Sequence, residues 1–349
     1  MKSQRSAHGR GLRAFGIALG TLVLLALILF LFAAYILSPP ALPSAGILAT
    51  LEKGSSAADA AQTLKSAGAI RSAEAFRILI KARGMGGKLK AGTYRIEPGM
   101  NSIAVLDLIV SGRQAFIPLR LREGLTLSKV AAILEKEHIA DSAEFLKLAR
   151  DKDFTASLGI SAPSLEGYLF PDTYNFPTGY GAENAIRALV GEFRKKIAAN
   201  FPEAASLSPR ELEQKVILAS IVESEYSRPE EAPLMASVFY NRLKKGMRLE
   251  SCATVVYVIT EHEGRPHPKR IWDSDLEISD PYNCYQNRGL PPGPICSPGL
   301  VALDAAFHPA SSKYLFFRLI DVQEGRHYFS ETLEEHDRAA GLIVNRAKD

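Results

Sequence analysis

The chain has little of several features that mark common classes of protein. It has three cysteines and one tryptophan in 349 residues, so it is not a disulfide-dense scaffold. It has no excess of positive charge beyond its first residues, because Lys2, Arg5, Arg10 and Arg13 account for the whole formal charge of +4. The balanced remainder argues against a nucleic-acid-binding protein, which would show a basic face. It has no phosphate loop, dinucleotide fingerprint or zinc spacing, and we therefore expect no cofactor and no metal.

One long uncharged stretch stands out near the N-terminus. Residues 15–37 are almost wholly apolar or small, and at ~1.5 Å per residue a helix of this length crosses a ~30 Å hydrocarbon core. Basic residues precede the stretch and none follows before Lys53, which predicts a single-pass anchor with residues 1–14 in the cytoplasm. A cleaved signal peptide with small residues near 41–46 is the alternative. The proline-rich segment 38–50 is typical of a stiff stalk.

Two similar segments follow, seventy residues apart. Each contains apolar residues at helical spacing and then a Ser-Ala-Glu sequence, at Ser72 and at Ser142. Each predicts a pair of helices in which this serine caps the second helix. Residues 90–96 and 116–121 alternate like strands. The segments predict small mixed units that either bind a ligand or hold a second domain off the membrane.

The strongest chemical signal is a pair of acids at the end of an apolar helix. Ser208-Pro209-Arg210-Glu211 is a helix start with a capping box, and the helix runs to Glu223 and Glu225. A carboxyl group that loses water there has a raised pKa and can act as a general acid. Residues two apart on a helix point in different directions, so we expect one catalytic and one structural acid. The alternative is that both are solvated at the helix end.

Helix and loop signals surround this pair. Ser227-Arg228-Pro229-Glu230 predicts the start of another helix, which stops at Lys244-Lys245-Gly246. Residues 164–174 place acids among aromatic rings, and residues 282–295 form an aromatic segment followed by a turn-rich loop. Aromatic rings beside carboxylates suit sugars, whose faces are apolar and whose edges carry hydroxyls.

The motifs, taken together, resemble those of the endolytic murein transglycosylase (YceG-like) family, and the resemblance extends from the anchor to the C-terminus. The matching motifs are Glu166-Gly167 with Phe170-Pro171-Asp172-Thr173-Tyr174, Ala219-Ser220-Ile221-Val222-Glu223-Ser224-Glu225, Ala236-Ser237-Val238-Phe239-Tyr240-Asn241-Arg242-Leu243, Gly246-Met247-Arg248-Leu249, the loop 289–295 with Pro298-Gly299, and Gly325-Arg326-His327 with Phe329-Ser330 and Glu335-His336.

The resemblance implies an α+β fold behind a single N-terminal transmembrane helix over residues 15–37. A LysM-like α/β module is expected over 51–122, a second helical repeat or connector over 123–160, and a catalytic domain with a lysozyme-like active-site arrangement over 161–349. The resemblance also implies a single-pass protein of the cell inner membrane with its catalytic domain in the periplasm.

The implied reaction cleaves the MurNAc–GlcNAc β-1,4 bond within nascent peptidoglycan strands, without water, and leaves 1,6-anhydro-MurNAc ends. In the family the second acid of the Glu-x-Glu pair is essential, which corresponds to Glu225. One carboxyl group suffices, because the 6-hydroxyl of the substrate can replace an enzyme nucleophile. Glu225 first protonates the leaving oxygen and then accepts the hydroxyl proton. The candidates for supporting Glu225 or binding the glycan are Glu223, Glu166, Tyr174, Asn241, Tyr282 and Asn283.

The sequence leaves alternatives for the pairing of the cysteines and for the function. By the resemblance, Cys252 and Cys284 occupy positions that border the cleft, and we weigh a disulfide between them against free thiols. A non-catalytic peptidoglycan-binding scaffold and a muramidase that hydrolyses the same bond are the alternative functions. Glycan strands are the expected partner, with peptidoglycan synthases as further candidates.

Overall fold

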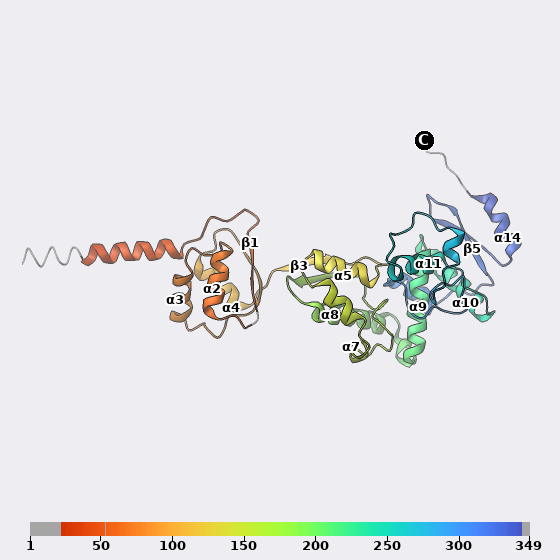
Figure 1. Cartoon of the computed structure of the whole chain (residues 1–349), viewed down its shortest axis with the longest axis horizontal. Helices are drawn as coiled ribbons and strands as arrows, with labels where there is room; N and C mark the ends of the chain where they lie inside the picture. The colour runs from red at the N-terminus through yellow and green to blue at the C-terminus, as the bar shows by residue number, and fades with distance from the viewer. Residues whose placement is uncertain (1–21, 53, 344–349) are drawn as a thin grey trace, which may run out of the picture. The chain divides into compact units, whose positions relative to one another are not determined.

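The computed structural model describes residues 22–52 and 54–343, and it divides the chain into two units (Figure 1). The first unit ends at Phe116 and includes residues 177–179, and the second comprises residues 117–176 and 180 onward. Three two-stranded sheets accompany the helices in the described part of the chain, which confirms the mixed α+β class.

Residues 22–37 form a helix whose large apolar side chains are exposed. Within the described residues, no helix combines the length and the hydropathy that crossing a membrane requires. The cytoplasmic segment predicted over 1–14, and residues 15–21 of the predicted membrane helix, lie outside the described residues.

The first unit is built around a small antiparallel sheet. Its elements are β1 (Ile47–Leu51), α2 (Ala57–Ser66), α3 (Ala73–Ala82), β2 (Gly92–Ile96) and α4 (Ser102–Ser111). Strand β1 pairs with β2 in the register Ile47 to Ile96, and the core beneath it contains the fully buried Phe76 and Tyr94. Because β1 begins at Ile47, the last residues of the segment predicted as a stalk over 38–50 belong to a strand.

The second unit is mainly helical. Its elements are β3 (Phe116–Arg120), α5 (Leu127–Lys136), α6 (Ser142–Ala149), α7 (Lys152–Ser157), β4 (Thr173–Pro177), α8 (Ala182–Asn200), α9 (Pro209–Glu225), α10 (Ala232–Lys244), α11 (Cys252–Tyr257), α12 (Asp273–Leu276), α13 (Leu300–Phe307), β5 (Phe316–Asp321), β6 (Arg326–Ser330) and α14 (Leu333–Arg338). Short 3-10 turns cover Pro202–Ser206, Pro229–Glu231 and Ala339–Leu342, and a π-helical turn covers Val258–His262.

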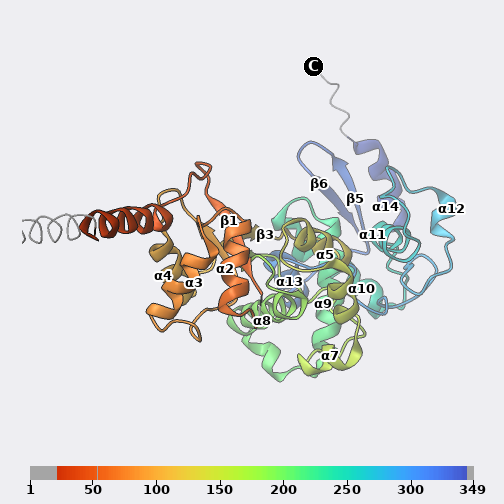
Figure 2. The same cartoon turned by 60° about the vertical axis from the view of Figure 1, so that its left-hand side comes forward.

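Helix α9 lies inside the second unit, where it packs against α10 and α13 (Figure 2). All side chains from Val216 to Val222 are buried, because this stretch is apolar around most of its circumference apart from Ser220, whose hydroxyl bonds to Ile217 O. Helices α5 and α6, which span the connector predicted over 123–160, contribute Leu127, Leu134 and Phe145 to the same core. Those residues are therefore an integral part of the second unit.

The helix starts test the capping predictions directly. Ser208 and Glu211 form the predicted capping box of α9, and Ser72 caps α3 as predicted. The cap of α6 is Asp141, one residue before the predicted Ser142, because an aspartate there already accepts the amide of Glu144.

The start predicted at Ser227 is wrong, since a 3-10 turn over Pro229–Glu231 comes first and α10 begins at Ala232. Pro233 fits the first turn of α10, where its missing N–H needs no partner.

Candidate active site

Glu225 is the last residue of α9, and two donors from another part of the chain hold its carboxyl group. The hydroxyl of Ser251 donates to Oε1 at 2.5 Å, and the backbone N–H of Ala253 donates to the same carboxyl group. The buried stretch before Glu225 fixes the direction in which α9 ends, so a rigid helix holds the Glu225 side chain in place. Glu225 itself is half-buried.

A cavity of about 320 Å³ opens beside this carboxyl group. It is lined by Glu225, Arg242, Leu249, Glu250, Cys252, Tyr285, Phe316, Phe317, Leu333 and His336. The other carboxylate of the lining, Glu250, is paired with Arg242 at 2.9 Å. Glu225 is therefore the one acid of this lining that has no basic partner.

Burial dominates the ionisation of Glu225. It raises the pKa of the carboxyl group above its ordinary value, while the hydrogen bonds from Ser251 and Ala253 lower that pKa by a smaller amount. A carboxyl group with a net raised pKa keeps its proton closer to neutral pH, which is the condition that a general acid requires.

Glu223 has different neighbours. The N–H of Gly299 donates to its Oε2 at 2.8 Å, and the hydroxyl of Tyr226 donates to its Oε1 at 3.4 Å. Burial, with a smaller contribution from Glu123, raises the pKa of Glu223 to about 7. Glu223 is not part of the lining of the Glu225 cavity, in agreement with the expectation that residues two apart on α9 point in different directions.

Glu166 lies in the core of the second unit, away from the Glu225 cavity. Its side chain is 3% exposed, and both of its oxygens accept the N–H of Leu127 at 3.1 Å. The hydroxyl of Tyr257 donates to it at 3.4 Å, and burial raises its pKa to about 8. Glu166 therefore receives the first amide of α5 and holds α5 against α11.

The four remaining candidates also make contacts that shape the protein. Tyr174 donates its hydroxyl to Phe170 O, and Asn241 donates to the carbonyls of Ser312 and Tyr314. Asn283 is fully buried and donates to the carbonyls of Leu276 and Ile278. Tyr282 packs its ring 5.1 Å from that of Tyr257. None of these four side chains lines the Glu225 cavity.

Sequence reasoning missed several residues that do line or support this cavity. Arg242 follows the predicted candidate Asn241 in a quoted motif, and Tyr285 lies two residues after the candidate Asn283. His336 belongs to a motif as well, and its Nδ1 is buried without a hydrogen-bond partner. Ser251 has no local signal, because its contact with Glu225 joins residues 26 positions apart.

Of the two alternatives weighed for Cys252 and Cys284, the structure has free thiols, since all three cysteines are free. Cys284 is buried in the core of the second unit, where burial raises the pKa of its thiol to about 11. Cys252 is exposed, and its sulfur lies 3.2 Å from the hydroxyl of Tyr285. The two thiols therefore occupy different environments even though their backbone segments are close.

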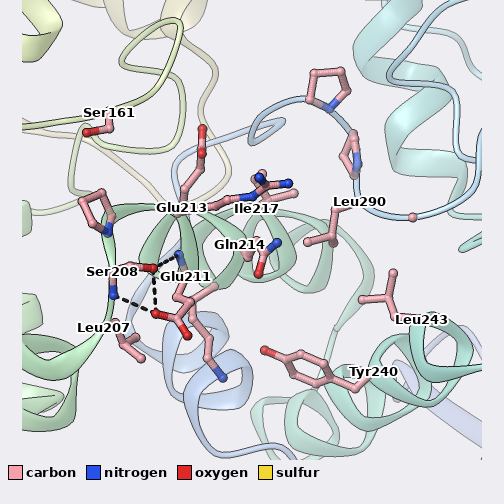
Figure 3. Close-up of a pocket in the computed structure, with 16 residues that line it drawn as sticks. Ser161, Leu207, Ser208, Glu211, Glu213, Gln214, Ile217, Tyr240, Leu243 and Leu290 are labelled. Atoms are coloured by element: carbon pink, nitrogen blue, oxygen red, sulfur yellow. Dashed lines mark hydrogen bonds between the residues drawn. The ribbon is translucent and has the colours of Figure 1, made fainter.

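A larger cavity, of about 1080 Å³, lies beside the first half of α9 (Figure 3). Two of its polar groups are engaged: the Glu211 carboxylate bonds Ser208, and the Lys215 ammonium donates to Ala306 O. Much of the remaining lining is apolar, with Leu207, Leu243 and Leu290 among it. The lining also contains Glu213, whose pKa burial raises while Arg210 lowers it by a smaller amount.

No group of three or more histidine, cysteine, aspartate or glutamate side chains gathers as a possible metal site among residues 22–52 and 54–343. His262, the last residue of the π-helical turn, pairs with Asp280 at 2.8 Å and packs against Tyr257 and Tyr282.

Comparison with known proteins gives consistent matches over most of the chain. The YceG-like family model matches residues 49–341. The endolytic murein transglycosylase of Bacillus subtilis (strain 168) is 31% identical over 311 residues, which cover 84% of each chain. The endolytic murein transglycosylase of Streptococcus pneumoniae serotype 2 is 29% identical over 324 residues, 84% of this chain and 58% of that protein.

A crystal structure of a YceG-like protein from Listeria monocytogenes is similar in fold. It is 33% identical in sequence, with a TM-score of 0.56, and the match covers 84% of this chain and 98% of that one.

Proposed function

The chain belongs to the YceG-like family, and we propose that it is an endolytic murein transglycosylase whose catalytic acid is Glu225. The family membership and the names of the relatives support the activity. The observation that supports the role of Glu225 is its position at the cavity as an acid with a raised pKa and no basic partner.

We propose the following reaction at this carboxyl group. Glu225 donates its proton to the glycosidic oxygen between MurNAc and GlcNAc as the β-1,4 bond breaks. The resulting carboxylate then accepts the proton of the MurNAc 6-hydroxyl, whose oxygen attacks C1 of the same sugar. The product is a 1,6-anhydro-MurNAc end, and the carboxyl group returns to its starting state with no water consumed.

The composition of the cavity lining favours this route over hydrolysis. A hydrolase with two working carboxylates needs the second one as a nucleophile or as a base for water. The second carboxylate of this lining, Glu250, is held by Arg242. An intramolecular hydroxyl removes that need, because it attacks at a high effective concentration.

The proposal extends to the place of the protein in the cell. We propose a single-pass anchor in the inner membrane, with both units on the periplasmic side, which places Glu225 near newly made strands and near peptidoglycan synthases. The support is the uncharged stretch 15–37 and the four basic residues before it. The order β1-α2-α3-β2 in the first unit supports a LysM-like module.

The test is a comparison of the full chain with its Glu225→Gln variant on polymerised peptidoglycan strands, followed by mass spectrometry of the sugar ends. Glutamine keeps the shape of the side chain but cannot donate an acid proton, so we expect anhydro ends from the native protein and a loss of about a hundred- to ten-thousandfold in the variant.

Two other outcomes would replace the proposal. Reducing ends in place of anhydro ends would make the protein a muramidase. Strand binding by both forms without cleavage by either would make it a scaffold.

A further inference from the structure

The turn that precedes Ser251 has an unusual backbone. Glu250 has φ = +52°, and it is one of two non-glycine residues with positive φ in the described part of the chain. A side chain with a Cβ atom is disfavoured in this left-handed region. Such a conformation persists only where surrounding contacts determine it, and it is often found at functional sites.

Arg242 supplies those contacts. Its guanidinium is buried, and Nη1 donates to the carbonyls of Arg248 and Leu249 at 3.1 Å and to the Glu250 carboxylate at 2.9 Å. The N–H of Glu250 donates to Cys284 O at 3.3 Å. One side chain from α10 and one loop carbonyl thus hold the turn from two sides.

Ser251, the next residue, is directed at Glu225 by this turn. Ser251 is the N-cap residue of α11, where a serine hydroxyl commonly accepts an amide of its own helix. Its hydroxyl makes no such bond and instead donates to Glu225 Oε1. Its carbonyl accepts the hydroxyl of Thr254 at 2.8 Å, and its side chain is 2% exposed. The Ser251 hydroxyl therefore bonds the Glu225 carboxyl group instead of capping α11.

We propose that Ser251 is a positioning residue for the carboxyl group of Glu225, and that the left-handed turn at Glu250, held by Arg242, serves to present it. The Ser251 hydroxyl donates to Oε1 and so restricts the rotation of the carboxyl group that transfers the proton. The inference rests on the proposed function, because it concerns the orientation of the acid in that reaction.

Other titratable or charged groups line the same cavity. They are Arg242 on α10, Glu250 in the turn, Cys252 on α11, Tyr285 in the following loop and His336 on α14.

The decisive variant is Ser251→Ala in the full chain. Loss of the hydroxyl frees the carboxyl group to rotate, so we expect kcat for strand cleavage to fall by about ten- to a hundredfold. The same hydroxyl favours the ionised form of Glu225, so its removal raises the pKa of that group further. The fall of activity at alkaline pH therefore moves to higher pH, and Ser251→Thr, which keeps a hydroxyl, should bring it back.

A matched pair at Glu250 tests the turn. Both Glu250→Gly and Glu250→Val remove the carboxylate, but glycine adopts positive φ freely and a β-branched residue does not. We expect Glu250→Val to lose several times more activity than Glu250→Gly. Equal losses would overturn the role of the left-handed turn.

A ¹³C NMR titration of the Glu225 carboxyl group separates this inference from the proposed function. If the pKa of Glu225 and the alkaline limb are the same in Ser251→Ala as in the native protein, Ser251 is not a positioning residue, whatever happens to kcat. If the Glu225 pKa rises in Ser251→Ala while the native protein cleaves no strands, the contact with Ser251 stands and the proposed function falls.

Discussion

Two carboxyl groups in the second unit, the half-buried Glu225 and the buried Glu166, have pKa values shifted in the same direction but differ in their surroundings. Burial raises the pKa of both. Glu225 borders a cavity of about 320 Å³, whereas Glu166 is 3% exposed and receives the first amide of α5. A raised pKa therefore identifies a buried acid, and only access to a substrate makes that acid a candidate for catalysis.

Substitutions at Glu225 and Glu166 should show the largest difference in activity, because one acid is proposed as catalytic and the other as structural. Glu225→Gln should lose about a hundred- to ten-thousandfold of strand cleavage, with little change in the temperature of unfolding. Glu166→Gln should retain most of the cleavage, because the residue does not line the cavity. Strand cleavage and thermal unfolding of the two variants, measured side by side, check this. A Glu166→Gln variant that folds normally but is inactive would contradict the comparison.

The pH dependence of stability should distinguish Glu166 as well. Its pKa rises from an ordinary 4.5 to about 8 on folding, so the folded state holds the proton more tightly than the unfolded state. The proton on Glu166 stabilises the folded state fully below about pH 4.5, and this contribution is lost as pH rises through about 8. The free energy of unfolding then falls by about 3 to 5 kcal/mol.

The measurement for this prediction is urea unfolding at pH 5 and pH 9. Glu166→Gln should lose less stability between these two values than the native protein, and Glu223, Glu225 and Glu213, whose pKa values are also raised, contribute to the remaining slope. An identical slope in both proteins would show that Glu166 is not the group that titrates.

The smallest expected effect concerns the difference between the cysteine that lines the Glu225 cavity and the two that are buried. Cys252 lines the Glu225 cavity and is exposed, while Cys284 and Cys296 are buried. Iodoacetamide should label Cys252 alone in the folded protein and all three thiols after unfolding without reductant, as peptide mass spectrometry can show. Labelling of only one thiol after unfolding would instead indicate that the other two cysteines form a disulfide. Cys252→Ser is the control that removes the folded-state label.

Local chemistry accounts for the sequence predictions that are confirmed. The capping box of Ser208 and Glu211 involves residues three apart, and the apolar run of α9 follows from the helical period. Ser227 and Ser142 show the limit of the same reasoning. A proline-led 3-10 turn follows the first, and an aspartate precedes the second, so a competing local structure forms the helix start.

The predictions about the site divide in the same way. The Glu-x-Glu pair is visible as two acids closing an apolar helix, and it puts Glu225 at the cavity. Tyr174, Asn241 and Asn283 look equally suited to sugar binding in the sequence. Their polar atoms instead bond backbone carbonyls, which a reading of residue types cannot foresee.

The sequence by itself determined the ends of α9 and the acid at its C-terminus, because these depend on spacing within one segment, and its motifs indicated the family and the α+β class by resemblance. The tertiary structure decided which side chains surround that acid. Ser251 lies 26 residues from Glu225 in the chain, and the remaining lining residues, from Arg242 to His336, come from α10, α11, α14, β5 and the loops between them. Contacts at such separations arise only when the helices pack, so the burial, the hydrogen bonds and the ionisation of Glu225 are properties of the folded chain.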